Sequence, residues 1–232
     1  MPVLIGEPYC PMTKEVLAYL SENTSLSSKV VSVRQLSGGI TNCIYKVSLN
    51  GDSDVLVRFH GTNTSTIINR QLEVLFRTYL HSHNLASPVL FHDDKGDVTV
   101  YINGSSLEPE QVHIYYPEIT DTISTLHSLP IPSSLTSEAT VFTQLNSWIN
   151  SLLSIESLHP HYQTVLNSRD ILSVCRERIS SLASGLSISN CICHNDLLSG
   201  NFILNDERDK VNLIDFEYTN INSPAYEIAN FL

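Results

Sequence analysis

A spaced set of polar side chains near the end of the chain constrains the fold more than any other feature. His194, Asp196 and Asn201 stand in the segment CHNDLLSGN, directly after a short apolar run. Asp215 ends a second apolar run, VNLI, and the intervening residues suffice for one β-hairpin. The layout H-x-D-x4-N, followed by an apolar strand that ends in aspartate, is typical of protein-kinase-like folds. We therefore expect that fold here.

These residue types suit the transfer of a phosphoryl group. A carboxylate such as that of Asp196 can orient a hydroxyl group and accept its proton. The amide oxygen of Asn201 and the carboxylate of Asp215 are hard oxygen ligands of the kind that Mg²⁺ binds. We expect His194 to brace the loop through hydrogen bonds rather than to take part in acid–base chemistry. The alternative interpretation is that the set consists of ordinary turn and capping residues.

The first hundred residues have the pattern of a small sheet interrupted by one helix. Three strand-like runs come first, at 30–36, 43–49 and 54–59. The apolar spacing then becomes helical, with a face that can be shared by Ile68, Leu72, Leu75 and Leu80. A further hairpin precedes residue 103, and helices dominate from there to the CHND segment. We predict an α+β chain with a small β-rich N-terminal lobe, residues 1–103, and a mainly helical C-terminal lobe, residues 104–232.

The N-terminal lobe contains candidate nucleotide-binding residues. Gly38 and Gly39 join two strands, where backbone N–H groups can approach phosphates, although many such turns only close a hairpin. Arg58 lies among apolar neighbours in VLVRFHG and can hold phosphates while it pairs with Glu73 of the predicted helix. A purely structural salt bridge is the alternative for that pair. The predicted nucleotide-binding set also contains the residues Thr41, Asn42, Tyr101 and Ile102, the last two in a hinge whose backbone would meet adenine.

Composition and charge argue against several classes of partner. The formal net charge of −11 disfavours nucleic acid and anionic membranes, since phosphate binding needs clustered Lys and Arg. We expect no membrane insertion and no signal peptide, because the apolar runs are too short and the first residues lack the required pattern. Five cysteines without metal-ligand spacing favour a reducing compartment, and hence the cytoplasm. Cys191 and Cys193 alternate around Ile192 like one face of a strand.

The segments LSGGITN, VLVRFHG, CHNDLLSGNFI and LIDFEYTNINSPAYEIANF resemble the choline/ethanolamine kinase family, and the resemblance runs from about Lys29 to the last residue. IDFEY is the specific part. Protein kinases have a glycine two positions after the metal aspartate, where this chain has Glu217. HNDLL and AYEIAN are more similar to ethanolamine kinases than to choline kinases.

The resemblance implies transfer of the ATP γ-phosphoryl group to ethanolamine or choline, which for ethanolamine is the first step of phosphatidylethanolamine synthesis. Asp196 and Asn201 are then the catalytic residues, and Asn201, Asp215 and Glu217 bind Mg²⁺. The substrate is a small cationic amino alcohol, in keeping with the acidic balance of the chain. A homodimer is left open.

The end of the chain departs from the family pattern. Family members continue beyond AYEIAN with a His-Phe pair and a helical segment that supplies much of the ammonium pocket, whereas this chain stops at Phe231 and Leu232. We therefore expect a C-terminally truncated kinase. Two alternatives remain: a catalytically impaired kinase-like protein that acts as a binding partner, and another small-molecule phosphotransferase of the same fold, such as an aminoglycoside kinase.

Overall fold

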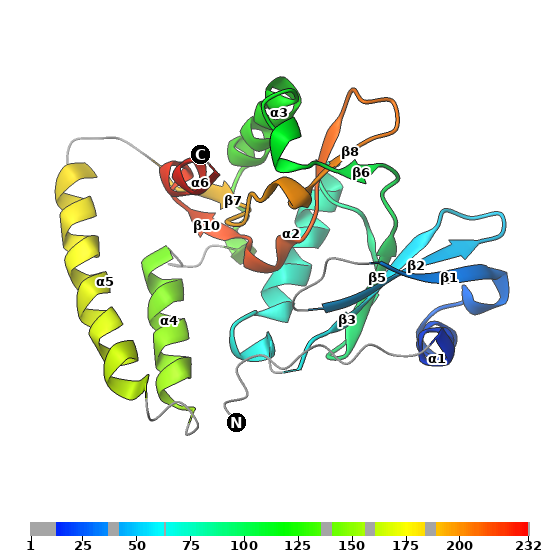
Figure 1. The fold of residues 1–232 in the computed structure, drawn as a ribbon, viewed down its shortest axis with the longest axis horizontal. Coiled ribbons are helices and arrows are strands. Elements are labelled where there is room, and N and C mark those ends of the chain that lie inside the picture. Colours follow the sequence, from blue (N-terminus) through cyan, green and yellow to red (C-terminus); the bar gives the residue numbers. More distant parts are fainter. Residues whose placement is uncertain are drawn as a thin grey trace. The chain divides into compact units, whose positions relative to one another are not determined.

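Five antiparallel strands in the order β1-β2-β3-β5-β4 form the sheet of the N-terminal part (Figure 1). The strands are β1 (Val30–Leu36), β2 (Asn42–Leu49), β3 (Val55–His60), β4 (Val89–His92) and β5 (Gly96–Val100). They are rich in β-branched residues and are separated by turns rich in Gly, Asp and Asn. The predicted strands and hairpin are thus confirmed.

The computed structural model describes residues 13–36, 42–62, 64–135, 141–155, 161–183 and 189–231. These residues fall into two compact units. The sheet unit consists of the described parts of Ile5–Ile119 and Ser199–Glu217, and the helical unit consists of those of Thr120–Leu198 and Tyr218–Leu232. The lobe boundaries predicted from the sequence, 1–103 and 104–232, stay a prediction. In the structure the segment Ser199–Glu217, which lies within the predicted C-terminal lobe, is part of the sheet unit.

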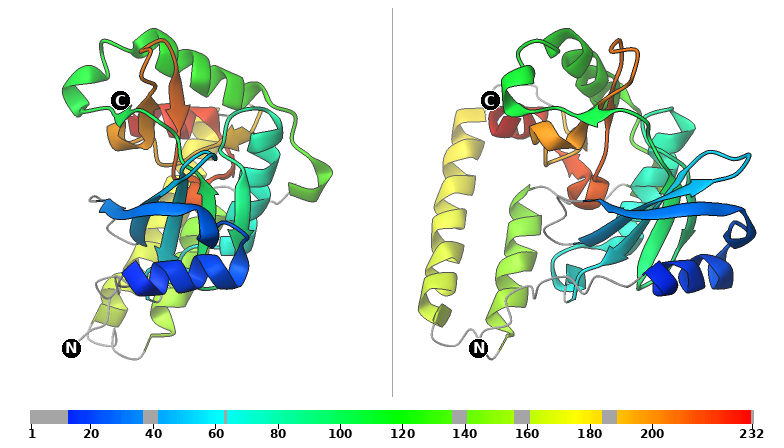
Figure 2. Two further views of the ribbon diagram at one scale, coloured as in Figure 1. Left: turned by 90° about the vertical axis from the view of Figure 1, so that its right-hand side faces the viewer. Right: turned by 45° about the vertical axis from the view of Figure 1, so that its right-hand side comes forward.

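The two faces of the five-stranded sheet have different characters, because side chains alternate along each strand. On one face Val47, Val57 and Val98 are fully buried and share a core with Leu20 of helix α1 (Thr13–Asn23). Figure 2 shows this helix beside the sheet. Burial of each such side chain stabilises the fold by roughly 1.5–3 kcal/mol. The opposite face carries charged side chains, and these meet helix α2 (Arg70–Ser82).

Helix α2 begins at Arg70 because Asn69 caps it. The Asn69 side chain accepts a hydrogen bond from the Leu72 N–H at 3.0 Å, an interaction that typically stabilises a helix by about 1 kcal/mol. The buried face of α2 contains two charged residues, Glu73 and Arg77, beside the apolar residues. Leu75, which the apolar spacing placed on the buried face, is 52% exposed. The prediction of the helix is confirmed, and the prediction for Leu75 is wrong.

A second, three-stranded sheet completes the sheet unit, in the order β6-β8-β9. Its strands are β6 (Ser105–Ser106), β8 (Phe202–Leu204) and β9 (Val211–Leu213). The Asn205 side-chain oxygen accepts hydrogen bonds from the N–H groups of Asp209 and Lys210, and so closes the β8–β9 turn. The hairpin predicted for this segment is therefore present.

The helical unit contains most of helix α3 (Tyr116–Ser128) and all of α4 (Val141–Leu153), α5 (Tyr162–Ala183) and α6 (Pro224–Phe231). Helices α4 and α5 lie side by side (Figure 1). Strand β7 (Cys191–Cys193) pairs antiparallel with β10 (Asn220–Asn222). Short 3-10 turns are η1 (Ser27–Lys29), η2 (Thr64–Thr66), η3 (Pro109–Gln111), η4 (Ser133–Leu135), η6 (Ser199–Asn201) and η7 (Phe216–Tyr218).

Two further observations bear on the environment of the chain. Within the described residues, no helix combines the length and the apolar character needed to cross a bilayer. Cys175, Cys191 and Cys193 are free thiols, whereas Cys43 is disulfide-bonded.

Candidate active site

Asn201 and Asp215 are held close together by the β8–β9 ladder. Phe202 pairs with Leu213, and the next backbone hydrogen bond runs from the Ile214 N–H to the Asn201 carbonyl oxygen at 3.0 Å. Asp215 then leaves the strand with a left-handed backbone, φ 64°, which costs a non-glycine residue about 1–2 kcal/mol. Its side chain keeps 36% of its surface exposed. The ladder therefore brings the backbones of Asn201 and Asp215 together, and the Asp215 carboxylate, on a strained backbone, has access to solvent.

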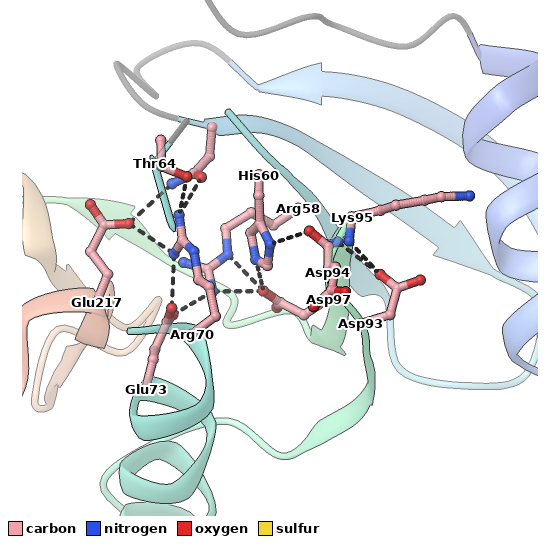
Figure 3. Close-up of polar contacts among 12 residues, drawn as sticks. Arg58, His60, Thr64, Arg70, Glu73, Asp93, Asp94, Lys95, Asp97 and Glu217 are labelled. Atoms are coloured by element: carbon pink, nitrogen blue, oxygen red, sulfur yellow. Dashed lines mark hydrogen bonds and ion pairs between the residues drawn. The ribbon is translucent and has the colours of Figure 1, made fainter. Parts of the chain in front are cut away.

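Arg58 contacts that carboxylate from strand β3. Its Nη1 lies 3.7 Å from Asp215 Oδ1, and its Nη2 makes ion pairs with Glu73 and with Asp97, the latter at 2.6 Å (Figure 3). Burial acts to lower the pKa of Arg58, but the charges of Asp97, Glu73 and Asp215 raise it well above its ordinary value. The predicted pairing of Arg58 with Glu73 is present, and Arg58 also touches the candidate metal ligand.

Arg70, at the start of α2, is a residue of the site that the sequence analysis missed. Its Nη1 lies 2.8 Å from Glu73 Oε2 and 3.2 Å from Glu217 Oε2 (Figure 3). Its Nη2 donates to Asn42 Oδ1 at 3.2 Å and to Thr64 Oγ1 at 3.1 Å. One guanidinium therefore ties strand β2, helix α2 and the segment after β9 together. The available signal was an arginine placed three residues before a predicted ion-pairing glutamate.

Glu217 lies buried at the other end of this contact, on the turn η7. It accepts a hydrogen bond from Asn42 Nδ2 at 3.3 Å in addition to the one from Arg70. Burial and then the negative charge of Asp215 raise the pKa of Glu217, although Arg70 and Arg58 act in the opposite direction. The carboxylates of Asp215 and Glu217 thus repel each other. A hard divalent cation would relieve that repulsion, and the oxygen donor set fits Mg²⁺.

A buried charge network supports these residues from the far side of Arg58. Asp97 on β5 pairs with Arg77 at 3.1 Å and lies 3.6 Å from His60 Nε2. Burial acts to raise the pKa of Asp97, but Arg58 and Arg77 hold it far below its ordinary value. Glu73 shows the same balance of burial against nearby arginines, and its pKa is lowered as well. The network fixes the orientation of Arg58 toward Asp215.

Asp196 belongs to the helical unit, where it follows strand β7 and is half-buried. The preceding residue, Asn195, has a left-handed backbone, φ 63°. Its N–H donates to Glu227 Oε1 at 2.5 Å, and its side chain donates to the Tyr218 carbonyl at 3.0 Å. His194 is fully buried. Fixed neighbours therefore set the position at which the Asp196 loop begins.

The remaining predicted residues have mixed outcomes. Gly38, Gly39 and Thr41 lie outside the described residues. Tyr101, after strand β5, donates its N–H to the Asp54 carbonyl at 2.8 Å, and its ring lies 4.0 Å from Lys46 Nζ. The nucleotide-binding roles of these residues, and that of Ile102, stay predictions.

Sequence comparisons identify relatives of this chain. A family model described as choline/ethanolamine kinase matches residues 33–232. A probable ethanolamine kinase of Arabidopsis thaliana is 32% identical over 213 residues, covering 88% of this chain and 56% of that protein. Ethanolamine kinase 1 of Mus musculus is 25% identical over 209 residues, covering 86% of this chain and 57% of that protein. The chain therefore spans little more than half the length of these relatives.

Solved structures show the same fold. An ethanolamine kinase of Plasmodium vivax superposes with a TM-score of 0.74 at 24% identity, covering 87% of this chain and 60% of that one. Choline kinase LicA of Streptococcus pneumoniae superposes with a TM-score of 0.71 at 24% identity, covering 94% of this chain and 73% of that one. An ADP-bound aminoglycoside phosphotransferase superposes with a TM-score of 0.64 at 21% identity, covering 93% of this chain and 74% of that one. The predicted α+β, protein-kinase-like fold is confirmed. Because the family model matches from strand β1 onward, the chain belongs to the choline/ethanolamine kinase family.

Proposed function

We propose that this chain takes part in ATP-dependent phosphorylation of the hydroxyl group of ethanolamine, with choline as the second acceptor. The observation that carries the proposal is the cluster of Asn201, Asp215 and Glu217 in one unit, held by Arg58 and Arg70. Clustered carboxylates beside fixed guanidinium groups suit a site for a metal–polyphosphate complex. The likeness to curated ethanolamine kinases supports ethanolamine as the first acceptor to test.

In this proposal Asn201 and Asp215 would hold Mg²⁺ through an amide and a carboxylate oxygen, and Glu217 would add a second carboxylate as the third donor. Mg²⁺, when bound, neutralises negative charge on the phosphates of ATP. Arg70 and Asn42 keep the Glu217 carboxylate in place through the contacts at 3.2 and 3.3 Å. Arg58 keeps Asp215 oriented and brings positive charge to the phosphate side, while Glu73 fixes Arg58 in turn.

Asp196 is proposed to orient the acceptor hydroxyl and to accept its proton. The hydrogen bond from the Asn195 N–H to Glu227 fixes the backbone one residue before Asp196, so the carboxylate has a defined starting point. A preorganised base of this kind lowers the barrier without a large conformational change at the moment of reaction. The ammonium group of the acceptor is attracted by the acidic chain, whose formal net charge is −11. A cytoplasmic location and a homodimer remain part of the proposal.

The test measures ADP released from Mg·ATP by the 232-residue chain with ethanolamine and choline supplied separately. We expect ethanolamine-stimulated release that is abolished in Asp196→Ala. Asp206→Ala, an exposed aspartate of the β8–β9 turn, is the matched control and should keep full activity. A parallel titration measures binding of Mg·ADP. Nucleotide binding without stimulation by either amine would contradict kinase activity of this chain and favour a binding partner instead. Stimulation that survives in Asp196→Ala would contradict the role of that residue.

A further inference from the structure

The helical unit contains a second cluster of chemically active side chains, which the proposed phosphoryl transfer does not use. Cys191 and Cys193 come from strand β7, and His127 comes from the last turn of α3. The two sulfur atoms lie 3.6 Å apart, and Cys193 Sγ lies 4.0 Å from His127 Nε2. All three potential ligand atoms lie within 4.8 Å of one another.

We propose that His127, Cys191 and Cys193 form a binding site for a borderline-soft divalent cation of the Zn²⁺ class. Zinc binds thiolate sulfur at about 2.3 Å and imidazole nitrogen at about 2.0–2.1 Å in tetrahedral geometry. Those bond lengths require ligand atoms about 3.5–3.8 Å apart. The sulfur–sulfur distance of 3.6 Å already satisfies this requirement, and the distance from Cys193 Sγ to His127 Nε2, 4.0 Å, exceeds it by a few tenths of an ångström. The distance from Cys191 Sγ to the same nitrogen is at most 4.8 Å, so the imidazole would have to move toward Cys191 by up to about 1 Å.

The local fold explains why the three groups converge. Residues two apart in a strand project from the same face, so β7 presents both thiols together. Pairing of Cys193 with Asn220 and of Cys191 with Asn222 in the β7–β10 ladder fixes their spacing. Both cysteines are buried, whereas the His127 side chain keeps 15% of its surface exposed. The sulfur ligands are thus shielded, and the histidine edge provides a route from solvent.

The fourth ligand position has a candidate in Glu227, which is buried on helix α6. Its Oε2 lies 2.5 Å from His127 Nε2, and its Oε1 accepts the Asn195 N–H. Binding of the cation would release the thiol protons and the proton shared by His127 and Glu227 to solvent, because metal ligands must be deprotonated. Glu227 Oε2, which contacts only the imidazole of the three proposed ligands, would have to move toward the thiols to become the fourth ligand, while its Oε1 keeps the contact with Asn195.

The two thiols differ in their electrostatic surroundings: the hydrogen bond with Cys191, burial and the charge of Glu227 raise the pKa of Cys193, so its proton would leave only when a cation replaces it. The hydrogen bond with Cys193 lowers the pKa of Cys191 despite burial, and the positive charge of His127 acts in the same direction. Two thiolates, a neutral imidazole and a carboxylate around a divalent cation leave one net negative charge, far less than the same buried groups would carry without the cation. The C-x-C spacing alone is too short for the usual cysteine clip, and the third ligand comes from a distant helix. From the sequence alone we could therefore predict that Cys191 and Cys193 share one face of a strand, but not that a third ligand lies next to them.

The test titrates Co²⁺ into the reduced, chelator-treated 232-residue chain in the presence of excess Mg²⁺. Cobalt bound to cysteine gives a thiolate-to-metal charge-transfer band, which an oxygen site such as that of Asp215 cannot produce. We expect a band that saturates at one equivalent, has the visible transitions of tetrahedral cobalt and is displaced by Zn²⁺. Cys191→Ser and Cys193→Ser should each lose it. Cys175→Ser, at an exposed free cysteine of α5, is the control and should retain it.

A second readout separates loss of the site from loss of the fold. Trp148, the only tryptophan of the chain, packs edge-on against Tyr218 within the helical unit, so its fluorescence reports whether that unit is folded. A complementary measurement on the unsubstituted chain is alkylation in urea just below the unfolding midpoint, where the buried thiols become accessible. Zn²⁺ should then protect Cys191 and Cys193 but not the exposed Cys175. Absence of the cobalt band in the wild-type chain, or its persistence in folded Cys191→Ser and Cys193→Ser, would overturn the proposal.

Discussion

Arg70 Nη1 lies 3.2 Å from Glu217 Oε2, and this contact joins the first residue of helix α2 to the turn after strand β9. The two side chains are buried to different degrees, with 14% and 4% of their surfaces exposed. A charge pair shielded from water interacts more strongly than one on the surface. The contact therefore gives the candidate metal site a link to the helix that also fixes Arg58.

A double-mutant cycle should detect this link. Arg70→Met, Glu217→Gln and the double variant are compared by urea unfolding monitored by circular dichroism. We expect a coupling free energy between 0.5 and about 3 kcal/mol, because the residues share one network. The solvent-exposed pair Lys29–Asp52 is the matched control, with an expected coupling below about 1 kcal/mol. Equal coupling in the two cycles would show that the Arg70–Glu217 contact adds nothing beyond a surface ion pair.

Replacement of Arg58 should destabilise the sheet unit severely. Arg58→Met removes one of the two arginines that pair with both buried carboxylates, Glu73 and Asp97, and leaves Arg77 as the other. Removal of one member of a buried ion pair typically costs about 3–5 kcal/mol, and we expect a loss of that order. The measurement is the free energy of unfolding in urea. Arg34→Met, at an exposed arginine of β1, is the control and should change that free energy by no more than about 0.5 kcal/mol. Comparable effects of the two substitutions would refute the network as a source of stability.

The low pKa of Asp97 predicts a specific acid sensitivity. Its carboxyl group is held below the ordinary value of about 3.9, so the unfolded state takes up a proton first as the pH falls. The contribution of Asp97 to stability is therefore present above about pH 4 and is lost progressively below it. We expect urea midpoints of the wild-type chain to drop below about pH 4 more steeply than those of Asp97→Asn. Asp52→Asn, at an exposed position, is the control, and its urea midpoints should follow those of the wild-type chain at every pH. If the midpoints of Asp97→Asn fell with pH as steeply as those of the wild-type chain, Asp97 would not be the source of the acid sensitivity.

Most of the secondary structure could be predicted because it depends on local patterns. The strands and the two hairpins follow from alternation and turn residues, and the position of Asp215 follows from its place at the end of an apolar run. Strands β6 and β10 were missed because runs of two or three residues become strands only through pairing with distant partners.

The buried face of α2 shows why the site could be predicted only in part. Helical spacing assigns apolar residues to the core and charged ones to solvent, yet Glu73 and Arg77 are buried and Leu75 is exposed. Charged residues on the facing strands overrule this assignment, because a charged side chain can be buried when an oppositely charged partner lies next to it. Arg70 was missed for the same reason, since three of its partners lie outside its own helix.

Gly104 provides a test of the connection that enters strand β6. Its φ is +139°, and a Cβ atom there would lie 2.2 Å from the Leu204 carbonyl oxygen. Gly51 has φ +80° but open space around it. We expect Gly51→Ala to cost about 1–2 kcal/mol from backbone strain alone, and Gly104→Ala to cost more, because the backbone of β8 must also shift. Both are measured by urea unfolding. A smaller loss for Gly104→Ala would contradict the close approach of β6 and β8.

Asp215→Asn should separate metal binding from folding. Asparagine has nearly the same shape and tolerates a left-handed backbone, so the chain should remain folded. It lacks the charge that the proposed Mg²⁺ ligand supplies. Calorimetric titration of ADP with and without Mg²⁺ measures how far the cation strengthens nucleotide binding. We expect Asp215→Asn to weaken the Mg²⁺-dependent part at least about tenfold, or about 1.4 kcal/mol, while Mg²⁺-free ADP binds no worse than to the wild-type chain. Asp206→Asn, in the exposed β8–β9 turn, should match the wild-type chain under both conditions. An unchanged Mg²⁺ effect in folded Asp215→Asn would remove Asp215 from the metal site.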